Sequence, residues 1–328
     1  MMIKHSIKPA FKEKNIPVIF ASSQEYVPYL SVALTLLKKN MNPDYNYDII
    51  VLVTDMDSIS QSLLVDNMKA KNISLRFINV SESLIKRGEY QQSNSCTSDS
   101  PLTFGRLLIE GLLSFEYKKI IYLDSDLVIN ADVSPLLSIP MEDKWVAAVR
   151  DVVIIGLFEN SPHNGGEVNK IAREQVTNEL QVLGLTEDVL NYFNAGVLVM
   201  NLEAFREFYT SDNLLDLVKT RSWLYYDQSI LNKVCLGHVY LLDHVWNYFV
   251  TSFFEQSLAM CTPEAICDAY KKARKNPKII HYAGASAPCR PKSIEVGTDL
   301  PEYFWKYARA SVWYEDLLAD YIRLHKQE

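Results

Sequence analysis

The sequence predicts an α/β fold with a mixed, mainly parallel sheet flanked by helices, and three observations support this prediction. The first 80 residues alternate between short apolar strands and helices of 3.6-residue spacing, which is the pattern of Rossmann-like βαβ units. Residues 120–123 are apolar without interruption, which is typical of a strand buried on both faces of a parallel sheet. The 328 residues are 48% hydrophobic and 22% charged, so they can bury a large core as one elaborated domain.

The elements of the first half follow from apolar spacing and turn residues. Strands are predicted at 17–21, 48–54 and 74–80, and the apolar run at 120–123 predicts a further strand that ends at Asp124. Helices are predicted at 29–40, from a cap at Ser60 to about Lys71, and at 103–115. The last helix should bury Phe104, Leu107, Leu108, Leu112 and Phe115, with Arg106 beside them. These units contain no Gly-x-Gly-x-x-Gly, which disfavours a dinucleotide-binding dehydrogenase.

The second half continues the alternation with longer irregular segments. Strands are expected at 145–149, 192–202, 239–243 and 278–281, and helices at 167–183 and 227–235. Residues 91–100 are polar and turn-rich, and we interpret them as a loop that could close as a lid. We expect residues 1–290 to form one domain and residues 291–328 to form a helical, aromatic-rich extension packed on it.

Composition narrows the class of function. A net charge of -7 argues against a nucleic-acid-binding protein, whose phosphate contacts need clustered Lys and Arg. The five cysteines are odd in number and lack Cys-x-x-Cys spacing, which favours a reduced, cytoplasmic setting. No secretory signal and no apolar run of bilayer-spanning length is present, so any membrane contact, such as one at the inner face of a membrane, should be peripheral. Acidic residues interrupt the basic ones in the aromatic tail, so we expect it to pack on the protein and not to serve as a membrane foot.

Two carboxylates, Asp124 and Asp126, follow the buried strand at 120–123 and are the best clue to function. Ligands of open α/β sheets collect at the carboxyl ends of the strands. Carboxylate oxygens there suit Mg²⁺ or Mn²⁺. An isolated Asp-x-Asp is also common in solvated surface loops, so the pair alone leaves both interpretations open.

Six short segments in one order resemble the family 8 retaining glycosyltransferases, the group that contains glycogenin and bacterial lipopolysaccharide galactosyl- and glucosyltransferases. The segments are Val18-Ile-Phe-Ala21, Thr103-Phe-Gly-Arg106, Tyr122-Leu-Asp-Ser-Asp126, Phe193-Asn-Ala-Gly196, Asp227-Gln228 and His281-Tyr-Ala-Gly284. The aromatic segments at 304–309 and 313–315 look most like the bacterial lipopolysaccharide enzymes.

This resemblance implies the GT-A nucleotide-sugar-binding fold, a divalent metal, usually Mn²⁺ with Mg²⁺ as the alternative, and a UDP-sugar donor. By position, the metal ligands would be Asp124, Asp126 and His281. The donor pocket would further include Ala21, Ser23, Tyr26, Arg106, Ser125, Asn194, Ala195 and Gly284, with Tyr26 stacked on uracil and Arg106 near the sugar.

The resemblance also implies roles at the transferred sugar for Asn194, Asp227 and Gln228, and a role on the acceptor side for Asp151. Gln228 would lie near the anomeric carbon, opposite the leaving UDP. Since Gln is a poor nucleophile, its carbonyl oxygen would stabilise positive charge, and the acceptor would attack from the face that UDP leaves.

Two positions depart from the family pattern. Ser23 stands where many relatives have an aspartate near the base. Ala287-Pro288-Cys289 stands where the family often has Lys-Pro-Trp, and the lysine normally meets the diphosphate. Arg290 and Lys292 are the candidates to replace this lysine, and the sequence leaves open whether either does.

The sequence therefore predicts transfer of a hexose from UDP-glucose or UDP-galactose to a carbohydrate or glycolipid acceptor, in bacterial surface glycan synthesis on the cytoplasmic side. Two alternatives remain open. One is a UDP-sugar-binding protein with little turnover. The other is a haloacid-dehalogenase-like phosphatase, because residues 124–128 also fit its Asp-x-Asp-x-Val loop.

Overall fold

The computed structural model describes residues 6–85, 100–159, 167–250, 263–283 and 300–325, and its centre is a seven-stranded sheet. The strand order is β3-β2-β1-β4-β7-β6-β8, and β7 alone runs opposite to the other six strands of this sheet. The strands are β1 Asn15–Ala21, β2 Asn46–Val53, β3 Ile73–Asn79, β4 Lys119–Leu123, β6 Val146–Arg150, β7 Phe193–Asn201 and β8 Val239–Leu242. The predicted mixed, mainly parallel sheet is confirmed.

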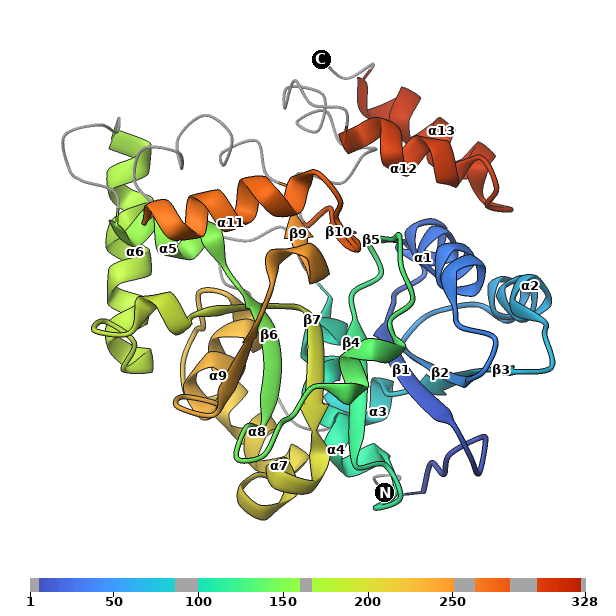
Figure 1. Ribbon diagram of the computed structural model, residues 1–328, viewed down its shortest axis with the longest axis horizontal. Helices are drawn as coiled ribbons and strands as arrows, with labels where there is room; N and C mark the ends of the chain where they lie inside the picture. The colour runs from blue at the N-terminus through green and yellow to red at the C-terminus, as the bar shows by residue number, and fades with distance from the viewer. Residues whose placement is uncertain (1–5, 86–99, 160–166, 251–262, 284–299, 326–328) are drawn as a thin grey trace.

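Helices flank this sheet (Figure 1). The α-helices among the described residues are α1 Val27–Asn40, α2 Ser58–Met68, α3 Ser81–Ile85, α4 Ile109–Leu112, α5 Val152–Glu159, α6 Glu167–Leu183, α7 Leu202–Phe208, α8 Ser211–Val218, α9 Tyr226–Val234, α11 Glu264–Arg274, α12 Leu300–Ala308 and α13 Tyr314–His325. Short 3-10 helices are η1 Pro101–Leu108, η2 Ser134–Ser138, η3 Val189–Asn191 and η4 His244–Trp246.

The core lies along the central strands. All nine residues of β7 are buried, as are the apolar residues of β4. Burying each Val, Leu, Ile, Phe or Met side chain of these strands contributes roughly 1.5–3 kcal/mol relative to leaving it exposed. The edge strand β3 is only half-buried, which agrees with its more polar sequence.

The helix expected at 103–115 was predicted wrongly in type and length. It is mostly the 3-10 helix η1, followed by the single turn α4, so Phe115 lies beyond it and is 67% exposed. Gly111 lets α8 approach closely, since a Cβ there would lie 2.9 Å from Ser211 Oγ. The Gly111 N–H donates to this same Oγ. The expected Ser60 cap was also wrong, because Asp57 caps α2 by accepting from the Ser60 N–H at 2.7 Å.

A second, three-stranded sheet was not predicted. It has the order β5-β10-β9, formed by β5 Leu127–Ile129, β9 Tyr248–Phe249 and β10 Ile279–His281. The antiparallel register of β10 on β5 pairs His281 with Leu127, the residue after Asp126. This small sheet therefore carries His281 to the end of β4 from far along the chain.

The C-terminal helices α12 and α13 lie beside α1 (Figure 1). Phe304 on α12 is fully buried, with its ring centroid 5.7 Å from that of Tyr29 on α1, and Ser311 is hydrogen-bonded to Ser31. The tail thus packs on the protein, while the domain division at residue 290 stays a prediction. None of the helices among the described residues combines the length and apolar character needed to cross a membrane.

Candidate active site

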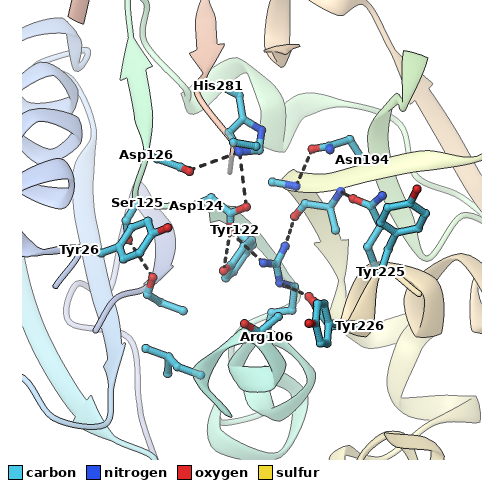
Figure 2. Close-up of a pocket in the computed structure, with 18 of the residues that line it drawn as sticks. Tyr26, Arg106, Tyr122, Asp124, Ser125, Asp126, Asn194, Tyr225, Tyr226 and His281 are labelled. Carbon is cyan, nitrogen blue, oxygen red and sulfur yellow. Dashed lines mark hydrogen bonds and ion pairs between the residues drawn. The ribbon is translucent and has the colours of Figure 1, made fainter. Parts of the chain in front are cut away.

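A pocket of about 430 Å³ opens at the carboxyl end of the parallel strands, a volume typical of small-molecule sites. It is reached by Ala21 at the end of β1, by Asp124 after β4 and by Asp151 after β6. Because β7 runs in the opposite direction, its first residues, including Asn194, lie at the same edge. Figure 2 shows side chains from these strands converging on one space.

Asp124, Asp126 and His281 meet in this pocket (Figure 2). His281 Nε2 lies 3.7 Å from Asp124 Oδ2 and 3.4 Å from Asp126 Oδ1. One possible ligand atom from each residue lies within 4.8 Å of the others. Two ligands bound to one ion at about 2.1 Å lie about 3–4 Å apart, so these three residues fit a shared divalent cation.

The two oxygens of Asp124 face different partners. Oδ1 accepts hydrogen bonds from Arg106 Nη2 and from the Tyr122 hydroxyl, both at 2.9 Å. Burial raises the pKa of Tyr122 well above its ordinary value, so the hydroxyl stays a donor. Oδ2 faces His281 and is the oxygen placed for a metal ion.

Arg106 lies beneath these carboxylates and is buried. Its Nε lies 2.5 Å from Asp227 Oδ2, its Nη1 donates to the carbonyl of Ala195, and its guanidinium lies 4.4 Å from the ring centre of Tyr122. Burial alone would lower the pKa of Arg106, but Asp124 and Asp227 outweigh burial and raise it. The guanidinium therefore stays charged and holds both carboxylates in place.

Asp227 lies in the first turn of α9 and is buried. Burial raises its pKa, which Arg106 lowers and Asp124 raises again, and the result is about 6. A carboxyl group with its pKa this close to neutral pH is common at functional sites.

Gln228 is held by both ends of its amide. Its Oε1 accepts from the Ala195 N–H at 3.0 Å, and its Nε2 donates to Asp151 Oδ2 at 3.0 Å and to the Tyr192 hydroxyl at 3.3 Å. Asp151 Oδ2 also accepts from Asn194 Nδ2 at 3.1 Å. The other oxygen of Asp151 accepts from two backbone N–H groups at the start of α5. Asp151 therefore fixes the side chains of Asn194 and Gln228 relative to each other.

The opposite side of the pocket is formed by the ends of β1 and β4. Ala21, Ser23, Tyr26 and Ser125 line it, and Ser125 Oγ donates to the carbonyl of Ala21 at 2.8 Å. The Tyr26 ring is partly exposed and lies beside the Ser125 loop in Figure 2. A planar ring in this position can stack on a flat ligand such as a base.

The structure thus gathers every predicted site residue that it describes into one pocket. Gly284 lies outside the described residues, as do residues 91–99 of the loop predicted at 91–100 and the segment 287–292. Sequence reasoning missed Tyr122 and Asn247. Tyr122 precedes Asp124 by two positions in a strand-like run, and residues i and i+2 face the same side of a strand. This spacing could have indicated that Tyr122 lies beside Asp124. Asn247, which accepts from His281 Nδ1, carries no comparable signal.

The fold and the pocket define a class: an α/β protein with a polar pocket at the edge of its sheet, lined by residues that fit a divalent cation. Comparison with known proteins narrows this class. The sequence signature of glycosyl transferase family 8 matches residues 17–289, so the chain belongs to this family.

Known proteins similar to this chain include several glycosyltransferases. A putative glycosyltransferase of Haemophilus influenzae is 25% identical over 244 residues, which cover 71% of this chain and 63% of that protein. A lipopolysaccharide 1,2-glucosyltransferase of Escherichia coli is 26% identical over 213 residues, covering 62% of this chain and 54% of that protein. The chain therefore spans less than two thirds of the length of both relatives.

Solved structures share the fold over nearly the whole chain. The bifunctional glycosyltransferase WbbM, in its apo form, matches with a TM-score of 0.79 and 25% identity, over 96% of this chain and 53% of that one. The galactosyltransferase LgtC, in complex with donor and acceptor sugar analogues, matches with a TM-score of 0.66 and 21% identity, over 92% of this chain and 99% of that one. The chain has the GT-A glycosyltransferase fold, as the sequence predicted.

Proposed function

We propose that this protein is a metal-dependent retaining glycosyltransferase that moves a hexose, glucose or galactose, from a UDP-sugar to a carbohydrate or glycolipid acceptor. The observation that carries the proposal is the meeting of Asp124, Asp126 and His281 in one pocket, with Tyr26 across from them. A metal bound there would neutralise charge on the departing diphosphate. Two carboxylates and an imidazole favour Mn²⁺, since Mg²⁺ prefers oxygen ligands throughout.

The balance of charge in the pocket supports the requirement for a metal. Four carboxylates line it, on Asp124, Asp126, Asp151 and Asp227, whereas Arg106 is the one lysine or arginine lining it among the described residues. A diphosphate entering this pocket alone would be repelled. We therefore expect UDP to bind tightly only together with the divalent ion.

The residues around the sugar position support a role in orienting it. Asn194, Asp227 and Gln228 line the same pocket, and each is fixed by at least one partner within it. Fixed polar groups of this kind stabilise developing charge without reorganisation. We propose that Gln228, whose carbonyl oxygen also accepts from Ala195, faces the anomeric carbon. The acceptor would then attack from the face that UDP leaves, and the departing phosphate oxygen would take its proton.

The test is a screen of UDP-glucose, UDP-galactose and their N-acetyl forms with Mn²⁺, measured as UDP released with and without sugar acceptors. We expect one hexose donor to be turned over, and chelation of the metal to stop the reaction. Asp124→Asn and Asp126→Asn should each abolish release while the far-ultraviolet circular dichroism stays unchanged. The matched control is Asp143→Asn, because this carboxylate is exposed and does not line the pocket. Near-normal turnover by either active-site variant would refute the metal assignment.

The same screen separates the two alternatives. Binding of UDP and Mn²⁺ without turnover of any donor would identify a sugar-nucleotide-binding protein. A phosphatase would release phosphate from simple esters without UDP, and the family match over residues 17–289 gives that reading no support. Because relatives include a lipopolysaccharide 1,2-glucosyltransferase, we propose a bacterial surface glycan as the acceptor class and a cytoplasmic location for the reaction.

A further inference from the structure

A continuous chain of hydrogen bonds joins the proposed metal ligand His281 to Gln228. His281 Nδ1 lies 3.1 Å from Asn247 Oδ1, and Asn247 Nδ2 donates to Asn194 Oδ1 at 2.8 Å. Asn194 Nδ2 and Gln228 Nε2 both donate to Asp151 Oδ2. His281, Asn247, Asn194 and Asp151 are all buried, which strengthens the hydrogen bonds between them.

We infer that Asn247 is a positioning residue that fixes the tautomer of His281, so that the Nε2 lone pair faces the metal position. This inference rests on the proposed function, because it concerns a ligand of the proposed metal. Asn247 lies between η4 and β9 and is not among the residues that line the pocket.

The direction of each hydrogen bond in the chain follows from Asp151. Asp151 Oδ2 accepts a hydrogen bond from Asn194 Nδ2, so Asn194 presents its NH₂ group to Asp151. The carbonyl oxygen of Asn194 then faces the opposite way, where it also accepts from the Gly196 N–H at 3.0 Å. Two independent partners therefore settle the orientation of the Asn194 amide.

The orientation of Asn194 determines that of Asn247. Since Asn194 offers its carbonyl oxygen, Asn247 must offer its NH₂ group and turn its own carbonyl oxygen to His281. A carbonyl oxygen accepts only, so the proton of the neutral imidazole lies on Nδ1. Its Nε2 then carries the lone pair and points to Asp124 and Asp126.

Packing keeps the ring from adopting another orientation. Phe249 meets the His281 ring edge-on, with centroids 5.3 Å apart and an interplanar angle of 85°. On another side the ring touches Gly196, where a Cβ would lie 2.2 Å from His281 Cε1. Because the ring cannot turn over, Nδ1 stays next to Asn247 and Nε2 stays next to the carboxylates. The carbonyl oxygen of Asn247 then holds the proton on Nδ1. Such partners of metal-binding histidines typically change metal affinity about 10–100-fold when removed.

The first measurement is the tautomer of His281 in the metal-free protein. Long-range proton–nitrogen correlation spectra of histidine-labelled protein, recorded where the imidazole is neutral, distinguish the two ring nitrogens, and His281→Asn assigns the signal. We expect the wild-type proton on Nδ1. A wild-type proton on Nε2 would overturn the inference.

The second measurement is the affinity for Mn²⁺ alone, by calorimetry, in two variants of Asn247. Asn247→Leu keeps the volume but removes the acceptor, and should weaken Mn²⁺ binding about 10–100-fold. Asn247→Asp keeps the acceptor and should restore most of the affinity and the Nδ1 proton. The matched control is Asn201→Leu, which removes a buried amide at the far end of β7 and should lower thermal stability without changing Mn²⁺ affinity.

The outcomes distinguish this inference from the proposed function. Wild-type affinity for Mn²⁺ in Asn247→Leu, or no rescue by Asn247→Asp, overturns the role of Asn247. Mn²⁺ binding with the expected tautomer but without sugar transfer overturns the proposed function alone. A wild-type protein that does not bind Mn²⁺ overturns both.

Discussion

Replacing Gly196 with alanine tests whether the metal position depends on close packing between β7 and β10. A Cβ at residue 196 would lie 2.2 Å from His281 Cε1, 2.6 Å from His281 Nδ1 and 3.0 Å from Asp124 Oδ2. Carbon atoms in contact lie about 3.5–4.0 Å apart, so the ring would have to move by more than about 1 Å. Metal sites keep their ligand distances to within about 0.2 Å, so this movement should remove the imidazole as a ligand.

We expect Gly196→Ala to lose at least about 10-fold in Mn²⁺ affinity, in line with the loss of positioning at other metal sites. The added methyl group should also cost about 1–3 kcal/mol of stability, the usual cost of overpacking a core. Calorimetry with Mn²⁺ and urea unfolding measure the two effects separately.

The matched control is Gly105→Ala, in η1 close to the same pocket. There the nearest atom to the new Cβ is Leu102 Cδ1 at 3.2 Å, the end of a flexible side chain, and the next contacts are at 3.8 Å. This variant should bind Mn²⁺ as the wild type does. A folded Gly196→Ala protein with unchanged Mn²⁺ affinity would refute the reasoning, because the ring would then not be confined.

Three further predictions concern stability. Arg106→Met leaves the buried Asp227 and its neighbour Asp124 without their cation, so it should cost about 3–5 kcal/mol in urea unfolding, and a loss below about 1 kcal/mol would contradict the pairing. Burial lowers the pKa of His244 from 6.5 to about 4. The unfolded chain therefore binds a proton at His244 before the folded protein does, and the free energy of unfolding falls by about 3 kcal/mol in total between pH 6.5 and pH 4. His244→Asn should flatten this dependence of the unfolding free energy on pH. Identical slopes for the variant and the wild type would disprove it. Phe304→Ala should cost about 3–5 kcal/mol because the ring is fully buried between α12 and α1, whereas an unchanged unfolding midpoint would show that the tail adds nothing to the core.

Most strands and the site residues at their ends could be predicted from the sequence. The buried run before Asp124 is long enough and apolar enough to fix both its type and its end. The predicted helix boundaries were wrong in two places, and in each a single contact sets the boundary. Gly111, in close contact with α8, lies where α4 ends after a single turn. Asp57 caps α2 in place of Ser60. The first contact joins segments that are distant in sequence, and the second is a choice between two nearby cap residues. The spacing of apolar residues reveals neither.

The contacts between the site residues were harder to predict from the sequence than the identity of these residues. The sequence suggested His281 through its resemblance to a family, but only the three-stranded sheet shows how β10 carries it to Asp126. The strand β10 was expected at 278–281, but its partners β5 and β9 have three and two residues, too few to leave a periodic pattern. Asn247 follows η4 without any motif, and its role is visible only through its hydrogen bonds to two other side chains.

The reversed direction of β7 explains why one short segment serves the whole pocket. Its first residues lie at the carboxyl edge of the parallel strands, and each of three consecutive positions binds a different part of the site. Asn194 accepts from Asn247 and Gly196, Ala195 accepts from Arg106 and donates to Gln228, and the Gly196 carbonyl accepts from the Asp124 N–H at 2.9 Å. A parallel strand in this position would bring its last residues to this edge instead. Sites built on strands hold their geometry better than sites on loops. The proposed metal ligands and the proposed sugar-facing groups are therefore tied by hydrogen bonds to one common strand, which fixes their separation.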